Sequence, residues 1–115
     1  MTAQIDDLKA VSEYDAAVEV LRLLAEPTRL RLLHLLEAGD QCVTDLAEAV
    51  GAAAPAVSQH LARLRRGGLV ASRRDGNRIF YRTINEHVEA LVNEALLQAD
   101  HLVGGALHHV IEKPR

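Results

Sequence analysis

Two short apolar repeats separated by a glycine constrain the fold of this chain more than any other feature of its sequence. The segment "CVTDLAEAVGAAAPAVSQHLARLRRGGLV" predicts a short helix over 43–50, a turn through Gly51, and a second helix from about Pro55 to Gly67 and Gly68. Two short helices joined by a tight glycine turn are the pattern of a helix-turn-helix.

The second helix of this pattern has one apolar and one polar face. Val57, Leu61 and Leu64 recur at helical spacing and are expected to face the core. Short polar side chains and arginines beside a small alanine are what a helix needs to enter a major groove and reach base edges. The outward positions that meet this description are Ser58, Gln59, Ala62, Arg63 and Arg66.

A strand pattern follows the double glycine. The segment "LVASRRDGNRIFYRTI" alternates in the manner of strands, and its central Asp-Gly is a strong signal of a β-hairpin. A helix-turn-helix over 43–67 followed by a β-wing over 69–82 is a winged helix. We therefore predict a mainly α fold with a small β-hairpin, whose basic tip displays Arg73, Arg74, Asn77 and Arg78.

Charge is distributed unevenly along the chain. From Ser58 to Arg82 there are seven arginines and one acid, Asp75, which is a local balance of +6. The net charge of the chain is −3, so the remaining residues carry −9. Such segregation is expected when one edge of an acidic body faces phosphate, and it indicates double-stranded DNA as a partner.

Helical spacing also precedes the helix-turn-helix. Apolar residues predict a helix over 12–25, and a second helix opens at Pro27, a residue suited to a first helical turn. In this second helix the leucines form the buried stripe. The same spacing would leave Arg29 and Arg31 toward water and place His34 near the stripe as a structural histidine.

The last helix, predicted over 85–103, is more apolar than a chain with a complete core requires. Its partner is expected to be its own copy in a two-fold dimer, assisted by the helix over 12–25. In the tail over 104–115, Gly104 and Gly105 would let the chain bend back. The broad apolar face comprises Val88, Leu91, Val92, Ala95, Leu96, Ala99, Leu102 and Val103.

Composition limits the class of protein. A chain of 115 residues is one domain by size, and it contains no apolar window long enough to span a membrane. Its N-terminus lacks the pattern of a signal peptide, so we expect a cytoplasmic protein. A Gly-rich phosphate loop, a nucleophile elbow and an HExxH motif are all missing from the sequence, which argues against an enzyme.

Histidines stand out in the last helix and after it. His87 and His101 are 14 residues apart, or roughly 21 Å along a helix, so they cannot bind one ion within a single chain. Antiparallel pairing of two copies would bring His87 of one to His101 of the other and create two symmetric sites. A single cysteine, Cys42, excludes an intrachain disulfide and leaves metal chemistry to histidines and carboxylates.

Four stretches together resemble the ArsR/SmtB family of metalloregulators: "LAEPTRLRLLHLL", "CVTDLAEAVG", "PAVSQHLARLRRGGLV" and "RRDGNRIFYR". They cover most of residues 24–82. The resemblance implies a dimeric winged-helix repressor whose operator affinity falls when a metal or another effector binds. It also implies that Ser58, Gln59 and the wing arginines contact DNA.

The resemblance also limits which kinds of metal site the chain can form. A family thiolate site uses "CVCDL", whereas this chain reads "CVTDL" and places Thr44 where the second thiolate should be. Cys42 is therefore interpreted as a small buried hydrophobe. The family's zinc and cobalt sensors use carboxylates and histidines of the last helix. The matching positions here read Asn85, His87, Gln98 and His101, so two strong ligands have become amides.

The actinobacterial nickel and cobalt sensors of the family are a closer match, through "NEHV" and an acid-histidine pair ahead of a terminal His-His. Imidazoles and carboxylates without thiolate suit Ni(II) or Co(II). Zn(II), a non-metal effector, or activation in place of repression remain as alternatives, and His60 is interpreted as a helix-packing residue. The metal ligands implied by this resemblance are His87, Asp100, His101, His108 and His109.

Overall fold

The computed structural model describes the backbone of residues 2–112 and the side chains of residues 12–104. The predicted class, mainly α with a small antiparallel sheet, is confirmed. None of the helices in this part of the chain is both long and apolar enough to cross a membrane. The elements are α1 (Thr2–Leu24), α2 (Pro27–Leu35), the 3-10 helix η1 (Leu36–Ala38), β1 (Gln41–Cys42), α3 (Val43–Val50), α4 (Ala54–Arg66), β2 (Val70–Asp75), β3 (Arg78–Thr83) and α5 (Glu86–Glu112).

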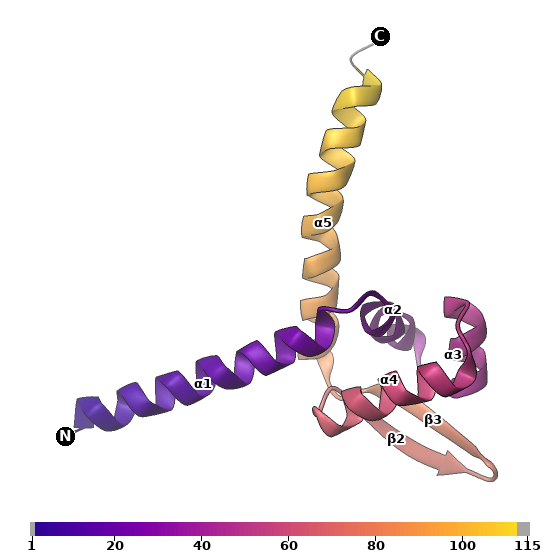
Figure 1. Ribbon diagram of the computed structural model, residues 1–115, viewed down its shortest axis with the longest axis horizontal. Helices are drawn as coiled ribbons and strands as arrows, with labels where there is room; N and C mark the ends of the chain where they lie inside the picture. The colour runs from indigo at the N-terminus through magenta and orange to yellow at the C-terminus, as the bar shows by residue number, and fades with distance from the viewer. Residues whose placement is uncertain (1, 113–115) are drawn as a thin grey trace.

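The elements form one body from which two helices project (Figure 1). Helices α2, α3 and α4 and the sheet lie together, with α4 beside the β2–β3 hairpin. Helices α1 and α5 start from neighbouring points on this body and extend away from it in different directions. The two predicted dimerisation helices are therefore the elements that extend furthest from the rest of the chain.

The core is aliphatic and is supplied by one face of each helix. The predicted inner face of α4 is confirmed, since Val57, Leu61 and Leu64 are fully buried. The leucine stripe expected in and after α2 is confirmed at Leu33 and Leu36, which are buried, while Leu30 is partly buried and Leu32 is buried as well. The largest fully buried side chains are Leu32, Leu33, Leu36, Leu46, Leu61, Leu64, Val57, Val70 and Val92.

The wing is a three-stranded antiparallel sheet in the order β1-β3-β2. The hairpin register pairs Asp75 with Arg78, so Gly76 and Asn77 form the turn. Gly76 has φ +64 and no residue other than glycine has positive φ in the described chain. Positive φ at the first turn position alone matches a type II′ turn, which suits the twist of a hairpin. The short strand β1 was not predicted from the sequence.

Two expectations for α2 are wrong. Arg29 is buried, with only 7% of its surface exposed, because its guanidinium lies against the end of α1. His34, expected to pack near the leucine stripe, is instead exposed. Arg31 is exposed as expected. Helical periodicity located the leucines, but it could not show which neighbouring element would cover the opposite side of the helix.

Helix α5 divides its apolar face between two environments. Val88 and Val92 are buried in the core of their own chain, and Leu96 packs against that core. This part of the predicted stripe therefore has a partner without a second copy. The outer half, including Leu102 and Val103, is more than half exposed. The helix also continues past the Gly104–Gly105 pair to Glu112, whereas the sequence suggested a bend there.

Candidate DNA interface and metal-ligand residues

The turn between α3 and α4 is built by backbone hydrogen bonds. Gly51 ends α3 with φ +68, a left-handed conformation that favours glycine. The amide of Ala52 then donates to the carbonyl of Ala47 at 3.1 Å, which reverses the chain before α4. Pro55 lies in the first turn of α4, where its missing amide proton costs no hydrogen bond.

The outer face of α4 is polar and basic, as predicted. Ser58, Gln59, Arg63 and Arg66 are all exposed, because the opposite face of the helix is fully packed. A cavity of about 270 Å³ on this face is lined by Gln59, Ala62, Arg63 and Arg66. The structure thus brings three of the predicted DNA-contacting side chains to one concave surface, with Ser58 exposed on the same helix.

The wing carries the second group of predicted contacts. Arg74, Asn77 and Arg78 are exposed, and neither arginine takes part in an ion pair among the described residues. Arg73 differs from them. Its Nε donates to Asp40 Oδ2 at 2.8 Å and its guanidinium lies 4.7 Å from the centre of the Phe80 ring.

The contact between Arg73 and Asp40 joins the wing to the loop before β1. Sequence reasoning missed Asp40, which is 33 positions away from Arg73. Arg73 therefore has a structural attachment in addition to its predicted role as a DNA contact. No pattern in the sequence pairs these two residues, since only the fold brings them together.

The predicted metal ligands are not assembled within one chain. His87, Asp100 and His101 are all exposed on α5. Among the described residues no three His, Cys, Asp or Glu side chains lie close enough to hold one ion. His108 and His109 lie outside the residues whose side chains are described. One copy of the described chain therefore does not form a complete metal site.

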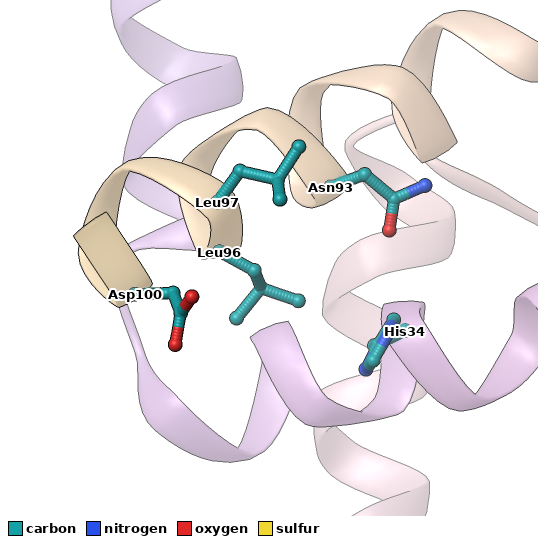
Figure 2. Close-up of a pocket in the computed structure, with 5 residues that line it drawn as sticks. All are labelled: His34, Asn93, Leu96, Leu97 and Asp100. Atoms are coloured by element: carbon teal, nitrogen blue, oxygen red, sulfur yellow. The ribbon is translucent and has the colours of Figure 1, made fainter. Parts of the chain in front are cut away.

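The start and the middle of α5 lie beside different cavities. His87 lines a cavity of about 220 Å³ that also includes Val20 of α1 and Leu91 of α5. Asp100 lines another, of about 350 Å³, between α2 and α5, and His34 lies across it (Figure 2). His87 and Asp100 therefore line separate cavities in one copy of the chain.

Two other residues from the sensing-site argument have structural roles. Asn85 Oδ1 accepts hydrogen bonds from the amides of His87 at 3.0 Å and Val88 at 3.2 Å. It therefore caps the start of α5, which explains an amide at this position. Cys42 is buried, with 4% of its surface exposed, as expected for a small hydrophobe.

A helix-turn-helix with a basic outer face and a basic wing defines the class of protein as a winged-helix DNA-binding domain. Comparisons with known proteins agree with this class. The family model described as "Bacterial regulatory protein, arsR family" matches residues 26–72. That segment runs from the start of α2 through α3 and α4 into β2.

Several curated proteins of Mycobacterium tuberculosis are similar to this chain. The HTH-type transcriptional regulator KmtR is 51% identical over 92 residues, which cover 80% of this chain and 71% of KmtR. The regulator NmtR is 45% identical over 82 residues, which cover 71% of this chain and 68% of NmtR. The repressor SmtB is 38% identical over 85 residues, which cover 74% of this chain and 63% of SmtB.

Solved structures show the same fold. The homodimeric winged helix-turn-helix DNA-binding domain Mb0332 of Mycobacterium bovis has a TM-score of 0.75 at 34% identity, covering 83% of this chain and 88% of that one. The antimony-specific transcriptional repressor AntR has a TM-score of 0.74 at 38% identity, covering 81% and 85%. The chain belongs to the arsR family of bacterial transcriptional regulators. It is a DNA-binding regulator and not an enzyme.

Proposed function

We propose that this chain is a homodimeric transcriptional repressor that is released from its operator when Ni(II) or Co(II) binds. The proposal rests on the exposed metal-binding side chains of α5. The helix presents exposed imidazole and carboxylate donors, His87, Asp100 and His101, along a surface that its own chain leaves open.

The open surface supports a dimer. Large apolar side chains are exposed on both projecting helices, including Tyr14 and Leu21 of α1 and Leu97, Leu102 and Val103 of α5. Contiguous exposed apolar surface is costly in water and marks an interaction site. The similar domain Mb0332 is homodimeric. A two-fold pairing through α1 and α5 would cover these side chains and bring donors from two copies together.

The donor set fits Ni(II) or Co(II) better than a thiophilic metal. Two imidazoles and one carboxylate offer nitrogen and oxygen, and the single cysteine of the chain is buried. Such donors suit Ni(II) and Co(II), and a set of five ligands favours these ions over zinc, which usually takes four. Within this proposal His87 of one copy and Asp100 and His101 of the other would hold the ion, and His108 and His109 would complete the shell.

Recognition of DNA is assigned to α4 and the wing. In this proposal Ser58 and Gln59 read base edges in the major groove, while arginines contact phosphates. Two copies must then place their α4 helices on half-sites about one DNA turn apart, roughly 34 Å. A metal that bridges the two copies of α5 would change operator affinity by changing this spacing. The proposed phosphate contacts are Arg63, Arg66, Arg73, Arg74 and Arg78, with Asn77 at the wing tip.

The proposal is tested by alanine variants of the donors. His87→Ala and His101→Ala are each expected to abolish the metal response, because each removes one ligand from both symmetric sites. Operator affinity without metal should stay close to that of the parent. The measurement is fluorescence anisotropy of operator DNA titrated with protein, with and without Ni(II), Co(II) or Zn(II). Glu48→Gln, which changes an exposed carboxylate of α3 far from the proposed ligands in the sequence, is the control.

One result would decide against the metal site. If both variants still release DNA on metal addition as the parent does, the sensing residues lie elsewhere. Reciprocity gives a second check, because allosteric coupling of about 1 to 3 kcal/mol acts equally in both directions. Operator DNA should therefore weaken metal binding by the same factor by which metal weakens DNA binding.

A non-metal effector is the alternative to a metal ion, because the structure contains a cavity that could hold a small molecule. The cavity between α2 and α5 is largely walled by Leu96 and Leu97, with His34, Asn93 and Asp100 as polar groups. Mostly apolar hollows with a few polar groups are typical of small-molecule sites. An effector bound there would act in the absence of metal, and His34→Ala would then alter the response while His87→Ala would not.

A further inference from the structure

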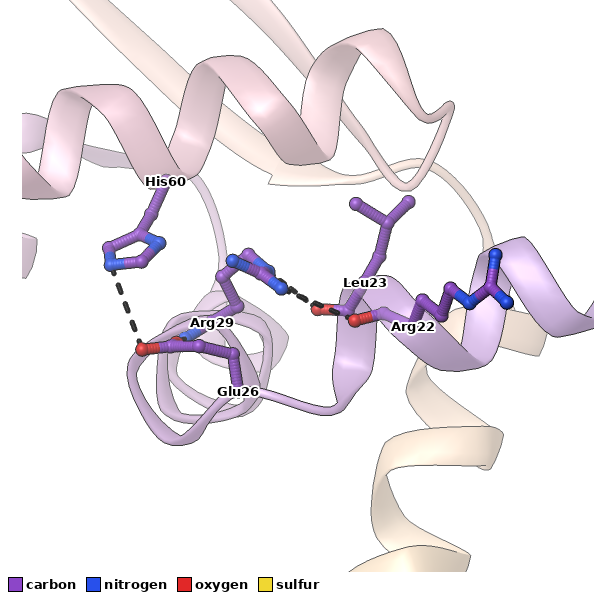
Figure 3. Close-up of polar contacts among 5 residues, drawn as sticks. All are labelled: Arg22, Leu23, Glu26, Arg29 and His60. Atoms are coloured by element: carbon purple, nitrogen blue, oxygen red, sulfur yellow. Dashed lines mark hydrogen bonds and ion pairs between the residues drawn. The ribbon is translucent and has the colours of Figure 1, made fainter.

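Helix α1 is joined to α2 by a buried arginine (Figure 3). Arg29 Nε donates to the carbonyl of Leu23 at 2.7 Å, and Arg29 Nη2 donates to the carbonyl of Arg22 at 3.2 Å. The last carbonyls of a helix have no partner within the helix, and a cation at this end is favoured by the helix dipole. The guanidinium therefore fixes the end of α1 against the start of α2.

Glu26 connects the same joint to α4. Its Oε1 accepts a hydrogen bond from the amide of Arg29 at 2.7 Å and caps the start of α2. Its other oxygen, Oε2, lies 3.8 Å from His60 Nε2, and Figure 3 shows this imidazole pointing from α4 toward the joint. That distance is an ion-pair contact when the imidazole carries a proton. About a quarter of the His60 side chain is exposed, so this face of α4 is partly shielded from water.

A second contact joins α1 to the end of α4. A Cβ placed on Gly67 would lie 2.2 Å from Leu23 Cδ1, so the tip of this α1 side chain packs directly on the backbone at the end of α4 and would have to move to admit a methyl group. Gly67 has φ −81, which any residue can adopt. The glycine therefore allows Leu23 to pack directly on the backbone of α4, and its own backbone conformation does not require it.

We propose that residues 22–29, the α1–α2 junction, position the recognition helix α4 relative to the dimerisation helix α1. Glu26 and His60 hold the middle of α4, and Leu23 and Gly67 hold its end. In this role His60 is a positioning residue and does not contact DNA. The proposal rests on the assignment of α1 to the dimer and of α4 to the operator.

The apolar packing of α4 does not supply this constraint by itself. Burial of Val57, Leu61 and Leu64 is favourable but non-directional, so it tolerates small rotations and slides of the helix. Specific contacts at two points along α4 remove that freedom. Operator recognition needs the constraint more than non-specific binding does, because two copies of α4 must meet two half-sites at once.

The sharpest test uses Gly67→Ala with a compensating change. The new methyl group would displace the Leu23 side chain and loosen the packing of α1 against the end of α4, without removing any polar group. We expect operator affinity to fall about threefold to tenfold, since both copies in the dimer are displaced. Leu23→Val shortens the opposing side chain, so the double variant should recover most of the affinity. A structural defect in α4 alone would not be rescued from α1.

The polar contact is tested by a second set of variants. His60→Ala should lower operator affinity about twofold to fivefold, the range of a partly exposed charge contact. His60→Gln retains a nitrogen donor but carries no charge, so it should restore only part of the lost affinity. Adding Glu26→Gln to His60→Ala should cause little further loss, because both act through one contact. Glu48→Gln, at an exposed position of α3 that takes part in none of these contacts, is the control, and circular dichroism and sedimentation should report folded dimers throughout.

The outcomes separate this inference from the proposed function. Unchanged operator affinity in Gly67→Ala and in His60→Ala would overturn the inference. A change in base preference or in the salt dependence of binding by His60→Ala would also overturn it, because that result indicates direct contact with DNA. If instead Ser58 and Gln59 variants leave operator preference unchanged, the assignment of α4 as the recognition helix fails.

Discussion

Arg29, a residue of α2, supplies hydrogen bonds to the last carbonyls of α1. A buried guanidinium is tolerated because its donors meet carbonyl groups that would otherwise lack partners. The fork geometry suits two adjacent carbonyls, which a lysine ammonium could not serve in the same way. The residue therefore contributes to stability through hydrogen bonds that the sequence pattern does not reveal.

Removal of these donors should destabilise the fold. Arg29→Met keeps the aliphatic stem but leaves the carbonyls of Arg22 and Leu23 without their charged donor. We expect the free energy of unfolding to fall by about 2 to 4 kcal/mol, the loss of two hydrogen bonds to a charged group. Chemical denaturation of the purified dimer at fixed concentration measures it. Arg31→Met on the same helix should cost about 1 kcal/mol, because Arg31 is exposed and makes a single long hydrogen bond, to the Val50 carbonyl at 3.3 Å.

Among the elements, the wing carries one arginine that contacts the body of the domain and two that project from the hairpin. Its arginines share a sequence pattern, yet their surroundings differ. The guanidinium of Arg73 is paired with Asp40 and lies over Phe80, whereas Arg74 and Arg78 project from the hairpin without an ion pair in the described chain. We therefore expect different electrostatic contributions from arginines that look equivalent in the sequence.

The salt dependence of DNA binding should separate them. Arg74→Ala and Arg78→Ala should each lower the slope of log affinity against log salt by about one, the effect of one lost phosphate contact. Arg73→Ala should lower it by less, because Asp40 already neutralises part of that charge. Asp40→Asn is the informative partner variant and should raise the slope. Equal changes from all three arginines would show that Asp40 has no such effect.

At the scale of the whole molecule, the two projecting helices α1 and α5 carry the surface through which we propose that two copies pair. The inner half of α5 completes the core of its own chain through Val88 and Val92. The outer half and the exposed face of α1 have no partner among the described residues. In the proposed dimer a second copy covers that surface. The same pairing sets the distance between the two recognition helices.

A charge on the outer half of α5 should prevent pairing. In Leu102→Asp, two symmetry-related carboxylates would enter the apolar interface, so the dimer dissociation constant should rise at least about a hundredfold. Sedimentation velocity should report monomer, and operator binding should be lost with it. Ala49→Asp adds the same charge at an exposed position of α3 and should remain dimeric. A dimeric Leu102→Asp protein would place the interface elsewhere.

The sequence by itself determined the winged helix and the faces of its recognition helix. Periodicity is a local property, so the spacing of Val57, Leu61 and Leu64 was enough to orient α4. Turn chemistry is local too, and it located the hairpin. The same reasoning placed the basic residues on one edge and showed that His87 and His101 are too far apart to share an ion in one chain.

Only the tertiary structure decided how these elements are connected. Asp40 with Arg73, Glu26 with His60, and Leu23 with Gly67 are contacts between segments that folding brings together. Periodicity describes one element at a time and says nothing about what covers its other side, which is why Arg29 was expected in water and Val92 at a dimer interface. Their burial depends on where α1 and α5 pack against the body of the domain, a property of the whole fold.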